Sequence, residues 1–170
     1  ERIIYRDYLM SYNFRVVEDK DIPMLSEWLR APHLRQWWGD PDDELGLIKH
    51  DLDDPKINLM VVEYNSQPFA YIQDYRVVDW PQDYFASFPE TTRAIDTFVG
   101  REDMLEKGHG RAYLRLHVQN LIKNGAEQIV IDPLYKNKRA IKAYQGAGFH
   151  QHSLHDTDEG EICLMIYLKN

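Results

Sequence analysis

The sequence predicts a single mixed α/β domain. Its 170 residues correspond to about one domain of typical size. The hydrophobic fraction of 44% and the charged fraction of 28% are those of a globular protein rather than of a disordered or fibrous chain. β-rich runs alternate with segments of helical periodicity along the whole length, and no repeat or low-complexity tract interrupts them. No internal domain boundary is therefore expected.

The first half is predicted to form a strand, two helices and a hairpin. Tyr12–Val17 is β-rich, and Asp19 and Pro23 then supply an N-cap carboxylate and a proline that a first helical turn tolerates. Apolar residues recur at helical spacing from Ile22 until Ala31-Pro32 ends the helix. The other expected elements are a short helix at Pro41–Asp51, strands at Ile57–Tyr64 and Phe69–Val77 around a turn at Asn65–Pro68, and a long loop at Val78–Glu90.

The second half is predicted to alternate strands and helices and to end on a hairpin. Strand Ala94–Val99 leads into a polar loop that ends in Lys107–Ala112. The helix that follows carries a core-facing apolar stripe and ends at Asn124-Gly125, where glycine takes the terminating position. The later elements are a buried strand at Gln128–Asp132, a helix at Lys138–Ala147, and a final strand pair that opens with Phe149–His155 and turns at Asp158–Gly160.

The charge balance argues against a nucleic-acid partner. Twenty basic and 28 acidic residues give a net charge of −8, so a cationic partner fits better. The longest uncharged apolar run, Ile162–Leu168, is too short to cross a membrane and no signal-peptide pattern is present, so we expect a cytoplasmic protein without a membrane partner. Cys163 lies in this run and is not expected to be reactive. Residues Glu1–Ser11 are interpreted as a leader or N-terminal extension.

A glycine-rich turn between a strand and a helix predicts a phosphate site. Unpaired backbone N–H groups and the positive end of the helix dipole meet at such a turn. Gly108 and Gly110 have no Cβ to block a pyrophosphate, and Lys107 and Arg111 add positive charge. A tight turn without further function is the alternative. The segment lacks the full dinucleotide fingerprint and the Gly-Lys-Ser/Thr of a nucleotide-triphosphate loop, which disfavours nicotinamide cofactors and ATP.

A second motif follows the strand at Gln128–Asp132. Asp132-Pro133 precedes the pattern Asn-x-x-Ala-x-x-x-Tyr, from Asn137 to Tyr144, which closes with Gly146-Ala147-Gly148-Phe149. Together with the glycine loop, this segment resembles the GNAT superfamily of acetyl-CoA-dependent N-acetyltransferases. The resemblance implies one GNAT-like domain over residues 12–170, with a mixed, mostly antiparallel sheet flanked by helices, and acetyl-CoA as co-substrate.

Other segments resemble the aminoglycoside 6'-N-acetyltransferases. The resemblance covers nearly everything from Tyr12 to Leu168. The chain departs from that pattern in its substrate loop, where Asp83-Tyr84-Phe85 stands in place of a tryptophan pair, and at Gln145 and Lys136. The segments that carry the resemblance are Glu27-Trp28-Leu29, His33, Trp37-Trp38-Gly39, Tyr71-Ile72-Gln73-Asp74-Tyr75 and Ile95-Asp96.

Acyl transfer to an amine requires a base and an acid. The attacking amine must lose a proton, and the departing thiolate must gain one. Asp96 is the candidate base, because a desolvated carboxylate in mid-strand has a raised pKa and still attracts an ammonium group. Pairing of Asp96 with Arg93 or with solvent is the alternative. Tyr144 is the candidate proton donor to the CoA sulfur, although its helical position alone is also compatible with core packing.

The resemblance also assigns binding residues. The pantetheine arm is expected on the backbone of Thr97, Phe98 and Val99 and on Asn137, which equally suits a helix N-cap. The other expected cofactor residues are Lys107, Gly108, His109, Gly110, Arg111, Ala112, Arg139 and Ala140. The amine is expected among aromatic faces and carboxylates, with surface or core packing as the alternative for each: Trp37, Trp38, Asp74, Asp83, Tyr84, Asp96 and Asp132.

The leading hypothesis is an enzyme that moves acetyl from acetyl-CoA to a primary amine of a small cationic molecule, with aminoglycoside 6'-amines first. The alternatives are acylation of another metabolite such as a siderophore precursor or polyamine, acylation of a protein amine, and a catalytically inactive acyl-CoA-binding sensor. His150, His152 and His155 lack the partners of a metal site, so no metal is expected. Monomer and homodimer both stay open.

Overall fold

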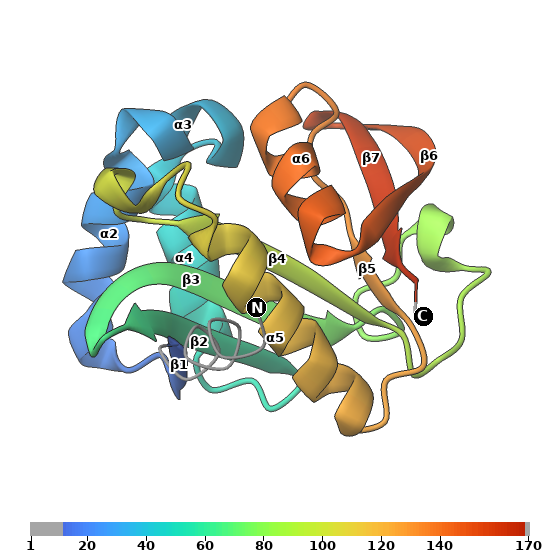
Figure 1. Ribbon diagram of the computed structural model, residues 1–170, viewed down its shortest axis with the longest axis horizontal. Helices are drawn as coiled ribbons and strands as arrows, with labels where there is room; N and C mark the ends of the chain where they lie inside the picture. Colours follow the sequence, from blue (N-terminus) through green and yellow to red (C-terminus); the bar gives the residue numbers. More distant parts are fainter. Residues whose placement is uncertain (1–11, 169–170) are drawn as a thin grey trace, which may run out of the picture. The chain divides into compact units, whose positions relative to one another are not determined.

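Seven strands within residues 12–168, the part of the chain that the computed structural model describes, form a mixed sheet in the order β1-β2-β3-β4-β5-β7-β6 (Figure 1). Glu1–Ser11, the expected leader, lie outside the described residues. β4 and β5 pair in parallel, whereas β1–β2, β5–β7 and β6–β7 are antiparallel, which confirms the mixed, mostly antiparallel sheet. The strands are β1 (Tyr12–Val16), β2 (Ile57–Tyr64), β3 (Gln67–Arg76), β4 (Arg93–Val99), β5 (Ile129–Ile131), β6 (Phe149–Thr157) and β7 (Gly160–Tyr167).

The described residues divide into two compact units. The first comprises residues up to 73 together with 97–109, and the second comprises 74–96 and the residues from 110 onward. Strands β3 and β4 and helix α5 (His109–Lys123) each continue from one unit into the other. Within residues 12–168, no helix is long and apolar enough to cross a membrane.

Three helices cover the first unit. They are α2 (Ile22–Arg30), α3 (Pro32–Trp38) and α4 (Pro41–Asp51), and α2 packs against both of the others while α4 also contacts β2. The sequence analysis missed α3, because it read Pro32 only as a stop signal. Ala31 is extended (φ −64°, ψ 139°) and ends α2, so Pro32 takes the first position of a new helix, where its missing N–H costs nothing.

Trp28 fixes the end of β4 in the first unit. Its indole is 7% exposed and lies directly against the backbone of Gly100, the residue after β4. A Cβ on Gly100 would overlap the indole carbons. Trp28 also packs edge-to-face on Phe98, with ring centroids 6.4 Å apart. The close approach of ring and backbone therefore requires glycine at this position.

In the second unit, α5 and α6 (Lys138–Ala147) have their expected positions. Asn137 caps α6 by accepting a hydrogen bond from the Ala140 N–H (3.2 Å), and Gly148 ends it in the left-handed conformation (φ 113°). The apolar cluster of this unit comprises Val77, Phe85, Ala94, Val130, Ile162, Leu164 and Ile166.

A buried ionic cluster joins β3, β4 and α5 in the second unit. Asp74 is 1% exposed and accepts hydrogen bonds from Arg93 Nη2 (2.6 Å) and Nε (2.8 Å) at one oxygen. Its other oxygen lies 2.8 Å from His117 Nε2. Burial opposes ionisation of Asp74, but the hydrogen bonds and charges of His117 and Arg93 prevail and hold its pKa below the ordinary value. Asp74 therefore stays ionised in the folded protein.

The hairpin of β6 and β7 ends the sheet. Its register shifts between Gln151 and Ser153, which marks a β-bulge in β6. Beyond the end of β5, the loop continues along β7: Cys163 N donates to Pro133 O (2.8 Å), and Tyr135 N donates to Glu161 O (2.8 Å). Cys163 is fully buried, as expected from its apolar surroundings.

Replacement of Gly100 tests the contact with Trp28. We expect Gly100→Ala to lower the free energy of unfolding by about 1–3 kcal/mol, because the indole must move out of a packed position. Gly46→Ala is the matched control, since a Cβ on Gly46 meets nothing within 4 Å and alanine favours helix α4 by roughly 0.5–1 kcal/mol. Urea unfolding measures both. Equal stability of Gly100→Ala and wild type would contradict the contact.

Replacement of Asp74 tests the ionic cluster. Asp74→Asn should lower the free energy of unfolding at pH 7 by about 3–5 kcal/mol, because Arg93 and His117 lose their counter-charge. A lowered pKa gives stability that is complete above the ordinary value near ~4 and is lost as the pH falls through the folded-state value.

The deficit of Asp74→Asn should therefore shrink in acid. Chemical unfolding between pH 7 and pH 3 measures it, with the exposed turn variant Asp158→Asn as a control expected to stay within about 0.5 kcal/mol of wild type. A deficit that is constant over this pH range would show that the charge of Asp74 is not what stabilises the cluster.

Candidate active site

Two carboxylates lie where the parallel strands of the second unit separate. The register pairs Ile95 with Ile131, and β5 ends there while β4 continues to Val99. The next residue on each strand is aspartate, Asp96 and Asp132. Since matched residues of parallel neighbours point to the same face of a sheet, the two carboxylates lie side by side on the face that carries Ala94 and Val130.

The charges of these two residues interact. Asp132 is half-buried, and burial together with the negative charge of Asp96 raises its pKa to about 8. The Tyr84 hydroxyl donates a hydrogen bond to Asp132 Oδ2 (3.0 Å), and this bond lowers the pKa of Asp132. Near neutral pH, the pair therefore carries less negative charge than two independent carboxylates would.

Three tyrosines lie within electrostatic reach of this pair. Tyr75 on β3, Tyr84 in the turn η2 (Asp83–Phe85) and Tyr144 on α6 all have pKa values above the ordinary one, first because of burial and then because of nearby negative charge. Asp96 and Asp132 act on each of the three. These phenols therefore keep their protons and can donate hydrogen bonds.

Tyr144 thus lies in the same neighbourhood as Asp96, and both come from the second unit. The Tyr144 ring packs near Phe149 (centroids 6.5 Å apart), and its hydroxyl also feels Tyr113 of α5. Sequence periodicity alone left core packing open for this residue. The negative charges of both aspartates also contribute to the raised pKa of Tyr144, so its hydroxyl lies within their electrostatic reach.

Arg93 does not pair with Asp96 as the sequence alternative suggested. Its guanidinium is engaged by Asp74, on the opposite face of the sheet from Asp96, since alternate residues of a strand face opposite sides. Asp74, an expected substrate ligand, has both oxygens engaged by Arg93 and His117. It is also 1% exposed, so its carboxylate is not presented to solvent.

The end of β4 has the backbone arrangement expected for a pantetheine site. Thr92 O accepts from Val77 N (3.0 Å) and Gly100 N donates to Phe69 O (2.8 Å), so the even-numbered residues of β4 direct their backbone groups toward β3. The backbone groups of Thr97 and Val99 therefore point to the other side, along which β4 extends past the end of β5.

Side chains hold this strand end in the first unit. Thr97 Oγ1 donates to Tyr71 O (2.7 Å), and the Phe98 ring stacks on Tyr71 with centroids 5.2 Å apart. His33 Nε2 donates to Val99 O (3.0 Å), which leaves its Nδ1 as an acceptor, buried and without a partner among the described residues. The bond from His33 means that Val99 offers its N–H, rather than its carbonyl, to a ligand.

Helix α5 begins at His109, between the two glycines and not after them as expected. Glu106 and Gly108 have positive φ values of 60° and 82°, and a Cβ on Gly108 would meet nothing within 4 Å. The His109 side chain turns into the first unit, where its Nδ1 lies 2.6 Å from Tyr12 Oη. Burial, with Lys107, lowers the pKa of His109. His109 can therefore serve a ligand through its backbone, not through its ring.

The other cofactor candidates lie in the second unit. Arg111 is exposed, and its side chain crosses Gly146 of α6, where a Cβ would lie 2.5 Å from Arg111 Cδ. Ala112 follows it in α5, while Arg139 and Ala140 lie in the first turn of α6. The side-chain oxygen of Asn137 accepts the capping hydrogen bond of α6, so this oxygen serves as the helix N-cap.

The aromatic substrate candidates of the first unit lie on α3. Trp37 and Trp38 are half-buried, and Trp38 packs edge-to-face on Phe98 with centroids 5.1 Å apart. In the second unit, Asp83 is exposed beside Tyr84 in η2. These residues supply aromatic and acidic surface in the segments where it was expected.

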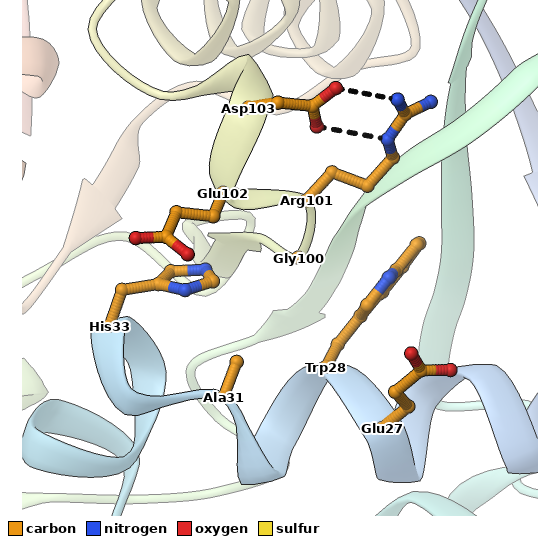
Figure 2. A pocket seen from close by; sticks show the side chains of 8 residues that line it. All are labelled: Glu27, Trp28, Ala31, His33, Gly100, Arg101, Glu102 and Asp103. Carbon is orange, nitrogen blue, oxygen red and sulfur yellow. Dashed lines mark hydrogen bonds and ion pairs between the residues drawn. The ribbon is translucent and has the colours of Figure 1, made fainter.

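A separate pocket of ≈ 530 Å³ lies in the first unit (Figure 2). Arg101 and Asp103 form a two-point ion pair at its rim, with Nη2 to Oδ2 at 2.7 Å and Nε to Oδ1 at 3.1 Å. None of the predicted catalytic or binding residues lines it. The lining residues are Glu27, Trp28, Ala31, His33, Gly100, Arg101, Glu102 and Asp103.

Sequence reasoning missed two residues of the candidate site, Tyr75 and His155. His155 on β6 stacks on Tyr84, with centroids 5.0 Å apart and 28° between the rings. Alternation along β3 could have identified Tyr75, since it shares the face of Val77. Among the described residues, no group of three or more His, Cys, Asp or Glu side chains is placed to hold a metal ion.

Known proteins are similar to this chain in sequence and in fold. A chain described as aminoglycoside N(6')-acetyltransferase type 1, from Klebsiella pneumoniae, is 27% identical over 166 residues, which covers 92% of this chain and 82% of the relative. The structure of AAC(6')-Ib with paromomycin and acetyl-CoA is also 27% identical, with a TM-score of 0.82, and covers 92% of this chain and 93% of that one. The same enzyme with coenzyme A and kanamycin is 26% identical, with a TM-score of 0.81 and 92% and 94% coverage.

The model of the acetyltransferase (GNAT) domain family matches residues 17–157. This range contains both glycine-bearing motifs and both aspartates at the strand ends. The fold and the match agree with the expectation from the sequence, and the co-substrate of this family is acetyl-CoA. The chain belongs to the GNAT acetyltransferase family.

Proposed function

We propose that this acetyltransferase acetylates a primary amine of a small cationic molecule, with an aminoglycoside as the first candidate. The observation that carries the proposal is the pair Asp96 and Asp132 at the end of the ladder between the parallel strands β4 and β5, with three protonated tyrosines around it. Such a site attracts positive charge and can accept a proton from it. The aminoglycosides bound by the similar structures are polycationic amines, which supports the same substrate class.

The backbone around the glycine loop fits acetyl-CoA. Gly108 leaves open space where a Cβ would stand, and α5 begins at the next residue, so its first N–H groups are available for a phosphate. Lys107 and Arg111 are exposed cations on either side of the two glycines. We assign the pyrophosphate to residues 107–112 and the pantetheine arm to the backbone of Thr97 and Val99. When bound, acetyl-CoA supplies the acetyl thioester.

Asp96 is the proposed base. It follows the last paired residue of β4, so its carboxylate lies at the point where the two strands separate. Its charge holds the incoming ammonium group, and it accepts the proton directly or through a water molecule. Asp132 lies next to it and binds the same cation or a second positive charge of the substrate.

Tyr144 is the proposed acid. Burial, Tyr113 and the two aspartates raise its pKa, so the phenol keeps its proton at working pH and can donate a hydrogen bond, and then the proton, to the sulfur as the C–S bond breaks.

The protein's own charge supports a cationic small molecule rather than a nucleic acid as partner, since the chain carries −8 overall. We place the reaction in the cytoplasm, where acetyl-CoA is available. An acyl-CoA sensor without catalysis would need neither a base at position 96 nor a proton donor at position 144.

An amine panel tests the function. Wild-type protein should release CoA from acetyl-CoA in the presence of kanamycin, and more slowly with a monoamine such as glucosamine. Asp96→Asn keeps the size and removes the charge, so we expect kcat/KM to fall by roughly 10²-fold or more, as for other general bases. Steady-state CoA release measures both, and calorimetry with CoA checks that the variant still binds the cofactor. CoA binding without turnover on any amine would favour the sensor.

Tyr144→Phe tests the acid. Phenylalanine keeps the ring packing on Phe149 and removes only the proton donor, so fold and CoA affinity should persist while kcat falls by roughly 10²–10⁴-fold. Single-turnover measurements separate the chemical step from product release. A chemical step as fast as that of wild type would return Tyr144 to a purely structural role.

A further inference from the structure

Tyr84 is held on three sides in the second unit. Its hydroxyl donates to Asp132 Oδ2 at 3.0 Å. One face of its ring stacks on His155, and Phe85 packs edge-on against it with centroids 4.7 Å apart. Phe85 is 4% exposed and belongs to the apolar cluster, so it anchors the turn η2 in the core. The position of the Tyr84 hydroxyl over Asp132 is therefore fixed by packing.

The stacking partner of Tyr84 is itself fixed. His155 Nε2 lies 2.7 Å from Ser153 Oγ, and that oxygen lies 2.9 Å from His152 Nδ1. The imidazole therefore has a defined orientation on β6. A ring that is stacked on one side and packed on another has little freedom to turn its hydroxyl away from Asp132.

The Tyr84 hydroxyl is able to donate this hydrogen bond whenever Asp132 is ionised. Burial and the charge of Asp132 raise the pKa of Tyr84, so the phenol keeps its proton. A donor to a carboxylate favours the ionised form. Without the hydroxyl, burial and Asp96 would raise the pKa of Asp132 further.

The groups around Asp132 come from six segments. Asp96 of β4 and Glu159 of the β6–β7 turn oppose its ionisation, whereas Tyr84 of η2 and a backbone hydrogen bond favour it. Tyr75 of β3 and Tyr144 of α6 lie within reach of its charge, and His155 of β6 lies behind Tyr84. Among the side chains named here, Tyr84 is the one whose hydrogen bond to Asp132 favours the ionised form of that carboxylate.

We propose that Tyr84 is a specificity-determining residue that acts through Asp132: its hydroxyl fixes this carboxylate beside Asp96, where it receives a second ammonium group of the amine. The inference rests on the proposed function, because it presumes that Asp96 meets the reacting amine. A substrate with one positive charge uses Asp96 alone. A substrate with several charges uses both carboxylates and gains from Tyr84.

The pH dependence of Tyr84→Phe tests this role. The variant keeps the ring and its stacking on His155. Binding of a second ammonium group requires an ionised Asp132. In Tyr84→Phe the rise of kcat/KM for kanamycin with pH should therefore occur at higher pH than in wild type. At pH 7, kcat/KM should fall by roughly tenfold for each unit by which the pKa of Asp132 rises. Glucosamine should lose little. Tyr167→Phe, a tyrosine that packs on Phe149, is the matched control and should behave as wild type.

A binding measurement without acetyl-CoA gives an independent readout. Calorimetry should show weaker kanamycin binding by Tyr84→Phe than by wild type at pH 7, and the difference should narrow as the pH rises and Asp132 ionises in both proteins. In an Asp132→Asn background, Tyr84→Phe should have no further effect on kanamycin affinity, because the two residues act as one unit. Thermal unfolding checks that each variant is folded.

Three results would overturn the inference: a pH profile of Tyr84→Phe equal to that of wild type, equal losses for kanamycin and glucosamine at all pH values, or additive effects of Tyr84→Phe and Asp132→Asn. Wild-type protein that binds no kanamycin would also overturn it. Failure of the proposed function has a different signature, since wild type would then acetylate no amine while calorimetry still reports on Tyr84 and Asp132.

Discussion

The unequal lengths of β4 and β5 determine the candidate site. Their parallel pairing stops at Ile95 and Ile131, and the next residue on each strand is an aspartate. A regular sheet would have continued the ladder and used the backbone groups beyond this point for pairing. Because β5 ends, the same few residues provide two neighbouring carboxylates and a length of β4 whose backbone is directed away from β3. The proposed acid–base groups and the proposed ligand-binding edge thus depend on the same feature of the sheet.

Asp74 and Asp132 show how neighbouring groups decide the state of a buried carboxylate. Both are in the second unit, and burial opposes ionisation in both. Arg93 and His117 supply positive charge to Asp74, and its pKa falls. Asp132 meets another carboxylate and neutral phenols, and its pKa rises. The first arrangement stabilises the fold, whereas the second places two carboxylates side by side, which is the arrangement that the proposed amine site requires.

Local sequence signals were sufficient for most elements. Helix α6 was predicted at Lys138–Ala147 with Asn137 as a suitable N-cap, and the structure has both. The resemblance led to the family that the match confirms. α3 was missed because a proline both ends one helix and begins the next. Strand alternation places Arg93 and Asp96 on opposite faces of the sheet. The actual partner of Arg93, Asp74, lies on another strand, and no local pattern predicts that contact. The Tyr84–Asp132 and Tyr84–His155 contacts join residues distant in sequence, for which no local pattern exists. The catalytic and binding roles themselves remain predictions.

The irregular register of β6 has a consequence for how the sheet meets other chains. β6 is the last strand in the order, so its outer edge presents backbone groups that another strand could pair with. The bulge between Gln151 and Ser153 breaks the even spacing of those groups, and the polar side chains of His150, His152 and Asp156 are exposed along the strand. A strand from another chain would therefore not find the evenly spaced backbone groups that regular pairing requires. The defect in pairing therefore protects the protein against edge-to-edge aggregation.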